Sequence, residues 1–231
     1  MAGMMETGLY LAQMEIGPLA NFVYLVGDAE SREVAVVDPA WDVARIRETV
    51  EAEGLTVRAV LITHGHPDHI NGVTPLLEWS DATVYAHRGD LDWLVEGGPT
   101  MIGYVPPVPR SSITPVDSDT RLRIGKVEIA FLHTPGHTPG SQCFLVQGRV
   151  VSGDTLFIGA CGRTDLPGGD PGQLYHSLHD RLAKLDDGMI LLPGHNYGEA
   201  SSTLGEEKRT NPFLTCERLE NFIARVSPRL F

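Results

Sequence analysis

A cluster of three histidines and one aspartate within six residues constrains this chain more than any other feature. His64, His66, Asp68 and His69 directly follow the apolar run 59–62. Such a run is typical of a buried strand, so the cluster lies where a strand passes into a loop. In extended backbone His64 and His66 point the same way and can reach one point, while Asp68 and His69 can reach a second. Because imidazole and carboxylate groups bind divalent metals, the cluster predicts a metal site rather than a polar loop.

Three further candidate ligands each follow an apolar run and a glycine. They are His137, Asp154 and His195, in the pairs Gly-His, Gly-Asp and Gly-His. Glycine lets the backbone turn sharply and approach a metal closely. Taken singly, each pair can be an ordinary turn. Together with the first cluster, four strand ends that deliver ligands to one edge predict an active site on a layered α/β scaffold.

The order of these motifs, H-x-H-x-D-H followed by Gly-His, Gly-Asp and Gly-His, resembles the signature of the metallo-β-lactamase fold superfamily. The resemblance covers about residues 8–200. It implies an α/β fold, a four-layer αβ/βα sandwich with the metal site at one edge between two sheets. We therefore expect a single catalytic domain over residues 1–231, with a short helical C-terminal extension over about 205–231.

Two subfamilies of that superfamily match parts of the chain. The stretch 161–165, Cys-Gly-Arg-Thr-Asp, is similar to the persulfide dioxygenases, as is Tyr197 after the last Gly-His pair. Residues 166–170 and 205–213 look more like the glyoxalase II-like hydrolases, and Gly-His-Asn-Tyr stands at 194–197 where the dioxygenases usually have Ala-His-Asp-Tyr. The resemblance favours the dioxygenases, with the hydrolases as the alternative.

The favoured resemblance implies a non-haem iron persulfide dioxygenase, which oxidises glutathione persulfide with O₂ to sulfite and glutathione. One Fe(II) per chain would be held by a catalytic triad of His64, His137 and Asp154. The other motif residues would orient these ligands and water; they are His66, Asp68, His69 and His195.

The alternative resemblance implies a binuclear hydrolase that cleaves S-acylglutathione thioesters with two Zn(II) or a mixed Zn/Fe pair. One metal would be held by His64, His66 and His137, and the other by Asp68, His69 and His195, with Asp154 bridging them. A non-catalytic metal-binding module would need a closed coordination sphere or a missing ligand. All seven positions are present here, and none is the thiolate preferred in closed zinc sites.

The candidate substrate contacts are Cys161, Arg163 and Tyr197. Arg163 offers a planar fork for a glutathione carboxylate, and its alternative role is a surface ion pair with Asp165 or Asp170. Cys161 has no adjacent histidine that would activate it as a nucleophile, so we expect it to pack or to line the pocket.

Composition is typical of a cytoplasmic enzyme with a small-molecule substrate. The net charge of −12 and the pI near 5.1 speak against a nucleic-acid partner. Three widely spaced cysteines imply no disulfide framework. No secretory leader and no apolar run long enough to span a membrane is recognisable. The oligomeric state stays open, with a homodimer as one option.

Local patterns predict the elements that would carry these motifs. We expect strands at 21–25, 34–37 and 59–62, a helix capped by Asp42 through Glu51, and helices over 69–79 and 170–185. Five prolines predict that residues 97–118 lack regular structure. His176 and His179 lie off the apolar stripe of the last helix and are expected to be solvated.

Overall fold

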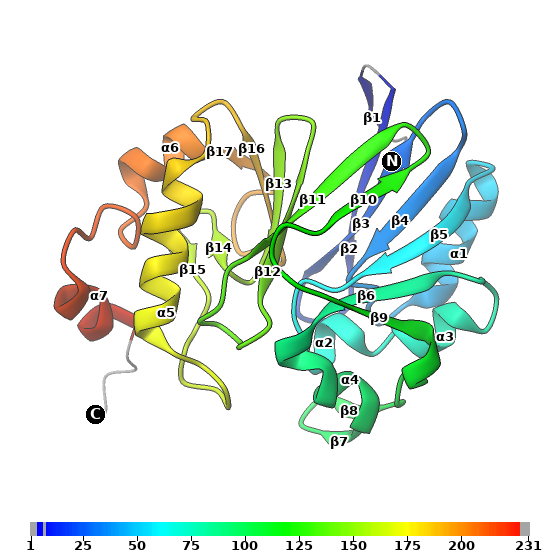
Figure 1. Ribbon diagram of the computed structural model, residues 1–231, viewed down its shortest axis with the longest axis horizontal. Helices are drawn as coiled ribbons and strands as arrows, with labels where there is room; N and C mark the ends of the chain where they lie inside the picture. The colour runs from blue at the N-terminus through cyan, green and yellow to red at the C-terminus, as the bar shows by residue number, and fades with distance from the viewer. Residues whose placement is uncertain (1–3, 7, 227–231) are drawn as a thin grey trace.

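Two β-sheets face each other, and helices cover the outer face of each (Figure 1). The computed structural model describes residues 4–6 and 8–226. In that part of the chain the first sheet runs in the order β1 (Met4–Glu6), β2 (Leu9–Ile16), β3 (Asn21–Asp28), β4 (Glu33–Val37), β5 (Thr56–Leu61), β6 (Thr83–His87) and β9 (Ile113–Val116). The second runs β10 (Arg121–Ile124), β11 (Val127–His133), β12 (Gln142–Val146), β13 (Arg149–Gly153), β16 (Ile190–Pro193) and β17 (Ser202–Thr203).

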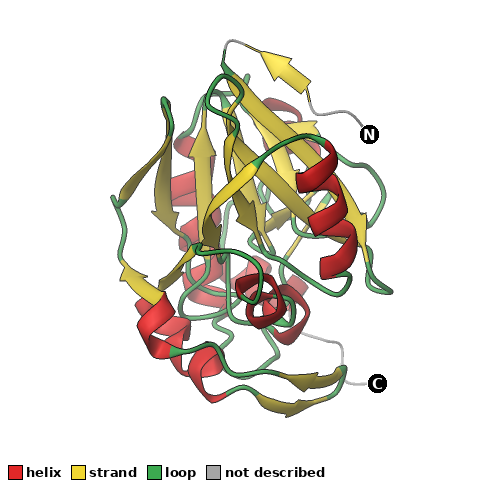
Figure 2. Ribbon diagram, turned by 90° about the vertical axis from the view of Figure 1, so that its right-hand side faces the viewer, coloured by secondary structure: helices red, strands yellow, loops and turns green. Residues whose placement is uncertain are grey.

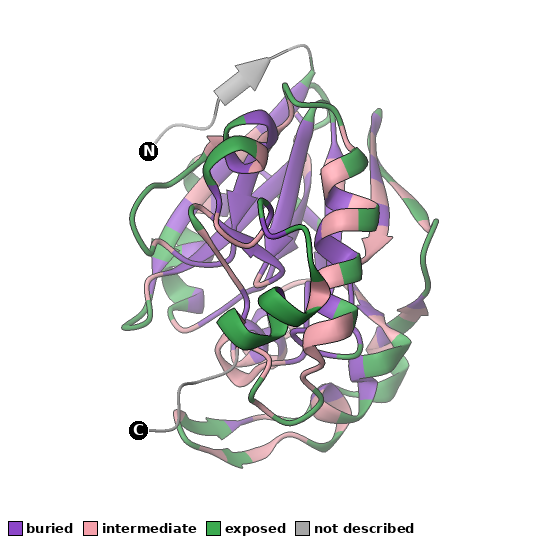
Figure 3. Ribbon diagram, turned by 90° about the vertical axis from the view of Figure 1, so that its left-hand side faces the viewer, coloured by how far each residue is buried: buried purple, intermediate pink, exposed green. Residues whose placement is uncertain are grey.

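The helices form the two outer layers. The first sheet is covered by α1 (Val43–Ala52), α2 (Pro67–Ile70), α3 (Val73–Leu77) and α4 (Leu91–Glu96), which lie on the side that faces the viewer in Figure 2. The second sheet is covered by α5 (Pro171–His176), a π-helical turn (Ser177–Arg181), a 3₁₀ turn (Leu182–Lys184), α6 (Leu204–Thr210) and α7 (Leu219–Val226). Figure 3 shows the helices of this second face, exposed on their outer side.

Alternating side chains on the strands build the layers. In β3, Val23 and Leu25 pack with Ile46 of α1 on the outer face of the first sheet. Phe22 and Tyr24 point the other way and pack between the sheets. Because strand side chains alternate between the two faces, a continuous apolar strand buries both. The expected four-layer αβ/βα sandwich is confirmed.

The expected strands and the first helix are also confirmed. The Asp42 side chain accepts a hydrogen bond from the backbone N–H of Arg45 and caps α1. Val43, Ile46 and Val50 turn one face of that helix into the core. The spacing of three and four residues explains why these side chains share a face.

The helix predicted over residues 69–79 is wrong as a single element. It is divided into α2 and α3, because the N–H of Gly72 donates to the Pro39 carbonyl at 3.0 Å. A Cβ atom at position 72 would lie 2.6 Å from that carbonyl oxygen. The close approach of the two backbones therefore requires glycine and interrupts the helix.

The prediction that residues 97–118 lack regular structure is also wrong. The segment contains a hairpin, β7 (Gly98–Thr100) and β8 (Gly103–Val105), a 3₁₀ turn (Arg110–Ser112), and strand β9. Strand β9 pairs in parallel with β6, where Ala86 lies opposite Pro115. Because β9 is an edge strand, proline is tolerated there.

The C-terminal part packs on the second sheet. Leu204 of α6 and Phe222 of α7 are buried in its outer cluster. Residues 227–231 of the expected extension lie outside the described residues. His176 is exposed as expected. His179 is half-buried, because its ring stacks on Tyr175 with the ring centroids 4.1 Å apart.

The strand ends explain how distant motifs meet. The chain leaves β5, β11, β13 and β16 directly before the four motif segments. Strands β13 and β16 are parallel, so their ends lie on the same edge. The N–H of Gln142, which lies opposite His133 at the end of β11, donates to the Thr63 carbonyl just after β5, so these two ends also meet. In the described part of the chain, no helix has the length and apolar character needed to cross a bilayer.

Candidate metal centre

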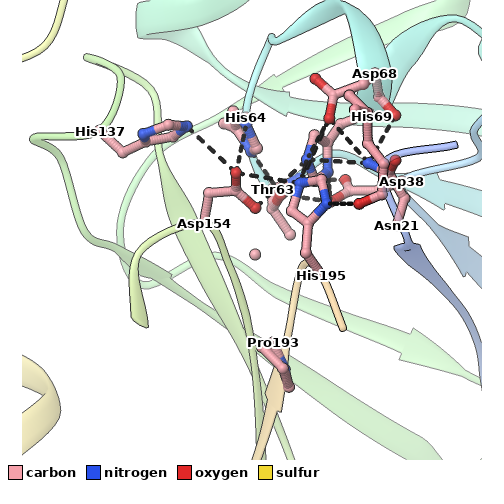
Figure 4. A network of polar contacts seen from close by, with 12 residues as sticks. Asn21, Asp38, Thr63, His64, Asp68, His69, His137, Asp154, Pro193 and His195 are labelled. Carbon is pink, nitrogen blue, oxygen red and sulfur yellow. Dashed lines mark hydrogen bonds and ion pairs between the residues drawn. The ribbon is translucent and has the colours of Figure 1, made fainter. Parts of the chain in front are cut away.

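The four motif segments converge on one cluster (Figure 4). The ligand atoms of His64, His66 and His137 lie within 4.8 Å of one another. A second group has the same compactness and consists of Asp68, His69 and His195. The sequence predicted two neighbouring points for these donors, and the structure forms both.

Asp154 lies between the two groups. Its Oδ2 atom is 3.6 Å from His137 Nε2 and 3.4 Å from His195 Nε2. Its Oδ1 atom is 3.4 Å from His69 Nε2. One carboxylate oxygen therefore faces both groups, which is the position a bridging ligand would need.

Four of the histidines are held by the ring nitrogen that faces away from the cluster. Each Nδ1 atom lies within hydrogen-bond distance of an oxygen: His64 with Thr63 Oγ1 (3.0 Å), His69 with Asp38 Oδ2 (2.9 Å), His137 with the Arg163 carbonyl (2.7 Å) and His195 with the Leu19 carbonyl (2.8 Å). We assign Nδ1–H as the donor, because carboxylate and carbonyl oxygens can only accept, and because the Thr63 hydroxyl already donates to Asp38 Oδ2 and so accepts from His64. The Nε2 lone pairs then point into the cluster, as metal-binding histidines require.

The donor atoms fit metal ions. His64 Nε2, His137 Nε2 and Asp154 Oδ1 are buried and have no hydrogen-bond partner in the described structure. Buried polar atoms without partners are costly and rare in proteins. His69 Nε2 and His195 Nε2 face each other at 3.1 Å. With Nδ1 as the donor on both rings, two lone pairs meet there, and only a cation or an added proton can relieve their repulsion.

The electrostatics of the cluster favour bound positive charge, whether it is a proton or a metal ion that displaces the proton. Burial lowers the pKa of His66 to about 3, so its imidazole is neutral. Burial also acts to lower the pKa of His69, but Asp154 and Asp68 outweigh it and raise the pKa to about 10. For Asp154, burial acts to raise the pKa, yet His69 and His195 hold it well below its ordinary value. The carboxylates thus stay ionised and attract cations.

Asp38 and Asn21 support the cluster, and the sequence interpretation did not include them. Asp38 is buried and accepts hydrogen bonds from the Thr63 N–H and hydroxyl at 2.7 and 2.5 Å, in addition to its contact with His69. Asn21 donates to Asp68 Oδ2 at 3.0 Å and accepts from the Trp41 indole N–H at 2.7 Å. These contacts hold two candidate metal ligands of the second group, His69 and Asp68.

Glycines next to the ligands permit close packing. A Cβ atom at Gly153, whose φ is +49°, would lie 2.4 Å from Thr63 Oγ1. At Gly194 it would lie 2.2 Å from Asp154 Oδ1. The expected role of glycine beside the ligands is thereby explained at both positions.

His66 differs from the other histidines in how it is held. No hydrogen bond to its ring is found among residues 4–6 and 8–226. Its ring instead stacks on Trp93 of α4, with centroids 5.7 Å apart and planes inclined by 16°. Trp93 was not expected at the site, because nothing in its local sequence marks it.

We expect Trp93→Ala to weaken metal binding at the first group by roughly 10- to 100-fold, because His66 loses the surface that orients its ring. Trp93→Phe keeps an aromatic face and should retain most of the affinity. A competition titration against a chromogenic chelator measures both variants. Unchanged affinity in Trp93→Ala would show that the stack does not position His66.

Asp90 connects the loop that carries His64 and His66 to the loop that carries His137. Its carboxylate accepts hydrogen bonds from the Gly65 N–H (2.8 Å), the Gly140 N–H (2.6 Å) and the Thr138 hydroxyl (2.6 Å). The side chain is buried. It therefore fixes the loop of His64 and His66 against the loop that carries His137.

Asp90→Ala leaves the buried N–H groups of Gly65 and Gly140 unpaired and leaves the Thr138 hydroxyl with Ser141 alone, so we expect it to lower the free energy of unfolding by roughly 3 kcal/mol. Urea unfolding measures this change. The matched control is Asp117→Asn, which removes the charge of an exposed ion pair with Arg88 and should change stability by less than about 0.5 kcal/mol. Equal stabilities of the two variants would contradict the role given to Asp90.

A cavity of about 720 Å³ opens above the donors, and Arg163 and Tyr197 line it. The Arg163 guanidinium forms the expected alternative ion pair, with Nε and Nη2 each 2.7 Å from an Asp165 carboxylate oxygen. The Tyr197 ring is stacked on His195, with centroids 4.9 Å apart. Cys161 lies outside the lining residues and packs against the outer cluster of the second sheet. Burial raises the pKa of its thiol to about 12.

Comparison with known proteins agrees with this site. Residues 16–195 match the family model described as the metallo-beta-lactamase superfamily. The probable metallo-hydrolase YqgX of Bacillus subtilis is 35% identical over 87% of this chain and 96% of its own length. The crystal structure of ETHE1 from Myxococcus xanthus has 32% identity and a TM-score of 0.79, covering 95% of this chain and 92% of that one. The structure of TTHA1623 in a di-iron-bound form has 37% identity and a TM-score of 0.77, covering 88% and 100%.

Proposed function

Because this chain belongs to the metallo-β-lactamase superfamily, we propose that it is a two-metal hydrolase that cleaves the acyl bond of thioesters. The observation that carries the proposal is the pair His69 and His195, whose Nε2 atoms face each other at 3.1 Å. Both rings are anchored through Nδ1. A second metal beside the first gives these lone pairs a ligand.

The candidate metal ligands of this chain divide between two metal sites. His64, His66 and His137 would hold one metal, and Asp68, His69 and His195 the other, with Asp154 between them. Two bound divalent metals would supply Lewis acidity, which polarises a carbonyl and lowers the pKa of water. In the overall reaction the water oxygen bonds to the acyl carbon, the carbon–sulfur bond breaks, and the thiol leaves with a proton.

Residues outside the donor set would bind and orient the substrate. Partial burial raises the pKa of Tyr197 to about 12, so its phenol stays protonated and can donate a hydrogen bond to a substrate oxygen. The apolar walls of the cavity would exclude bulk water from the reacting bond. The high pKa of Cys161 keeps its thiol protonated, so we assign it no nucleophilic role.

Persulfide dioxygenase is the second candidate. It is supported by the similarity to the mitochondrial persulfide dioxygenase ETHE1 of Bos taurus, which is 32% identical over 94% of this chain and 81% of its own length, and to the ETHE1 structure. His64, His137 and Asp154 would then hold one Fe(II) for glutathione persulfide and O₂. Asp154 Oδ2 lies 4.0 Å from His64 Nε2 and 3.6 Å from His137 Nε2. His66 lies in the same group as His64 and His137; it would be a metal ligand in the hydrolase and would orient ligands and water in the dioxygenase.

Two preparations decide between the two candidates, one loaded with Fe(II) and one with Zn(II), because the dioxygenase requires iron. Thioester hydrolysis is followed by thiol release from S-acetyl- and S-hexanoyl-N-acetylcysteamine and from S-lactoylglutathione. Oxygen consumption is followed with glutathione persulfide. We expect thiol release without oxygen consumption. Oxygen consumption without thiol release would overturn the hydrolase and support the dioxygenase.

A further inference from the structure

The cavity above the metal donors has apolar walls from several segments. Leu19, Trp93 and Leu166 line it, and Ile102 and Val105 come from the β7–β8 hairpin. Its volume of about 720 Å³ falls within the roughly 300–1,000 Å³ typical of small-molecule sites. The space is therefore large enough for a substrate that extends well beyond the reacting bond.

Charged groups are scarce on these walls. Apart from the metal-donor side chains, the charged residues that line the cavity within the described part of the chain are Glu96 and Arg163. The guanidinium of Arg163 already donates two hydrogen bonds of 2.7 Å to the Asp165 carboxylate. A substrate carboxylate at this position would replace one ion pair by another and gain little. Glu96 would repel it.

Glutathione carries two carboxylates and one ammonium group at neutral pH, and each loses water when it enters a protein site. Binding these groups requires matched charges on the protein. Beyond the metal ligands, the described cavity offers one arginine that already has a partner, and Glu96, which could match only the ammonium group; neither carboxylate of glutathione meets a free cation, and most of the other side chains are apolar. Its chemistry matches a hydrocarbon chain instead.

Resting on the proposed hydrolase function, we infer that the substrate is a thioester with an apolar acyl chain on an uncharged carrier, rather than a glutathione conjugate. The acyl chain lies against Trp93, Ile102 and Val105. The β7–β8 hairpin thereby sets the acyl-chain preference. At its tip Met101 is fully exposed and stands at the rim of the cavity.

Binding is measured by calorimetry with non-hydrolysable thioethers, so that the result does not depend on turnover. The ligands are S-ethyl- and S-hexyl-N-acetylcysteamine and S-hexylglutathione, titrated into the metal-loaded enzyme. We expect the hexyl ligand to bind roughly 10- to 100-fold more tightly than the ethyl ligand, because four more methylene groups are buried. We expect S-hexylglutathione to bind no more tightly than its uncharged counterpart. Tenfold tighter binding of S-hexylglutathione would overturn the inference.

Three variants of the β7–β8 hairpin test whether the acyl chain of the substrate lies against it. Ile102→Ser should weaken S-hexyl-N-acetylcysteamine roughly tenfold and leave the ethyl ligand unchanged, because it removes apolar contact area. Met101→Ser should lower the affinity for the hexyl ligand less than Ile102→Ser does. Because the Met101 side chain is fully exposed, this loss of affinity cannot arise from misfolding. Tyr104→Ser is the matched control, since Tyr104 is exposed on the same hairpin but does not line the cavity. Equal losses in all three variants would overturn the assignment of the hairpin.

The inference and the proposed function fail in different ways. Tight, chain-length-dependent binding without hydrolysis of any thioester would remove the hydrolase and keep the apolar ligand class. Hydrolysis of S-lactoylglutathione tenfold faster, in kcat/KM, than of S-hexanoyl-N-acetylcysteamine would keep the hydrolase and remove the inference.

Discussion

Asp154→Asn should lose both metals and lower kcat/KM for thioester hydrolysis by at least roughly 10³-fold, since metal-assisted charge stabilisation contributes several kcal/mol. The amide keeps the size of the side chain but removes the negative charge that faces His137, His195 and His69 at 3.4–3.6 Å. Metal analysis of the purified variant and kinetics with S-hexanoyl-N-acetylcysteamine measure the two effects.

The matched control is Asp119→Asn, which makes the same chemical change at an exposed position away from the cluster. It should keep full metal content and activity. An Asp154→Asn protein that still holds two metals would contradict the bridging position given to this carboxylate. Retention of one metal would show that Asp154 serves only one group.

Removal of both metals, a loss of about 8 kcal/mol over two sites, should lower the melting temperature by about 16–32 °C. A ligand at 1,000 times its Kd stabilises the folded state by about 4 kcal/mol per site, and each kcal/mol shifts Tm by about 2–4 °C in a protein of this size. Without cations, the largely buried Asp154 carboxylate and the facing His69 and His195 imidazoles lose their compensation.

Differential scanning fluorimetry before and after dialysis against a chelator measures this shift. Re-addition of zinc or iron should restore the original Tm, whereas magnesium should not, because it prefers oxygen ligands. A Tm that is insensitive to chelation would show that the donor cluster is stable by itself and does not require the metals.

The metal donors could be predicted from the sequence because each one follows a strand and a glycine or lies in one short motif. Asp38 carries the same signal, since it directly follows the apolar strand β4, and the same reasoning could have found it. Asn21 and Trp93 carry no such signal. Asn21 begins a strand and Trp93 lies on a helix, and only the tertiary packing brings them to Asp68 and His66.

The layers of the fold followed from the family resemblance and the individual strands from apolar patterns, but two element boundaries could not be predicted from either. The break at Gly72 depends on the approach of Pro39, which is distant in sequence. Strand β9 contains Pro115, and its edge position makes the proline acceptable. Local sequence propensity cannot predict either the helix break or the edge strand, because both depend on which distant segment packs beside them.

The donor geometry changes the preference between the two subfamilies. Sequence motifs at 161–165 favoured a single-iron dioxygenase. In the structure this stretch contributes the Arg163 carbonyl to His137 and an Arg163–Asp165 ion pair, while Cys161 packs away from the cavity. The motif therefore has a structural role that does not depend on a persulfide substrate, and the paired imidazoles of His69 and His195 weigh toward two metals.

The metal content of protein purified anaerobically from cells supplied with both iron and zinc tests the two-metal account most directly. Inductively coupled plasma mass spectrometry, referred to protein concentration from amino-acid analysis, gives the number of metals per chain. The account predicts about two metals per chain, in keeping with a two-metal site. A content of about one iron per chain, unchanged when His69 and His195 are both replaced by alanine, would contradict it and favour the His64, His137 and Asp154 triad.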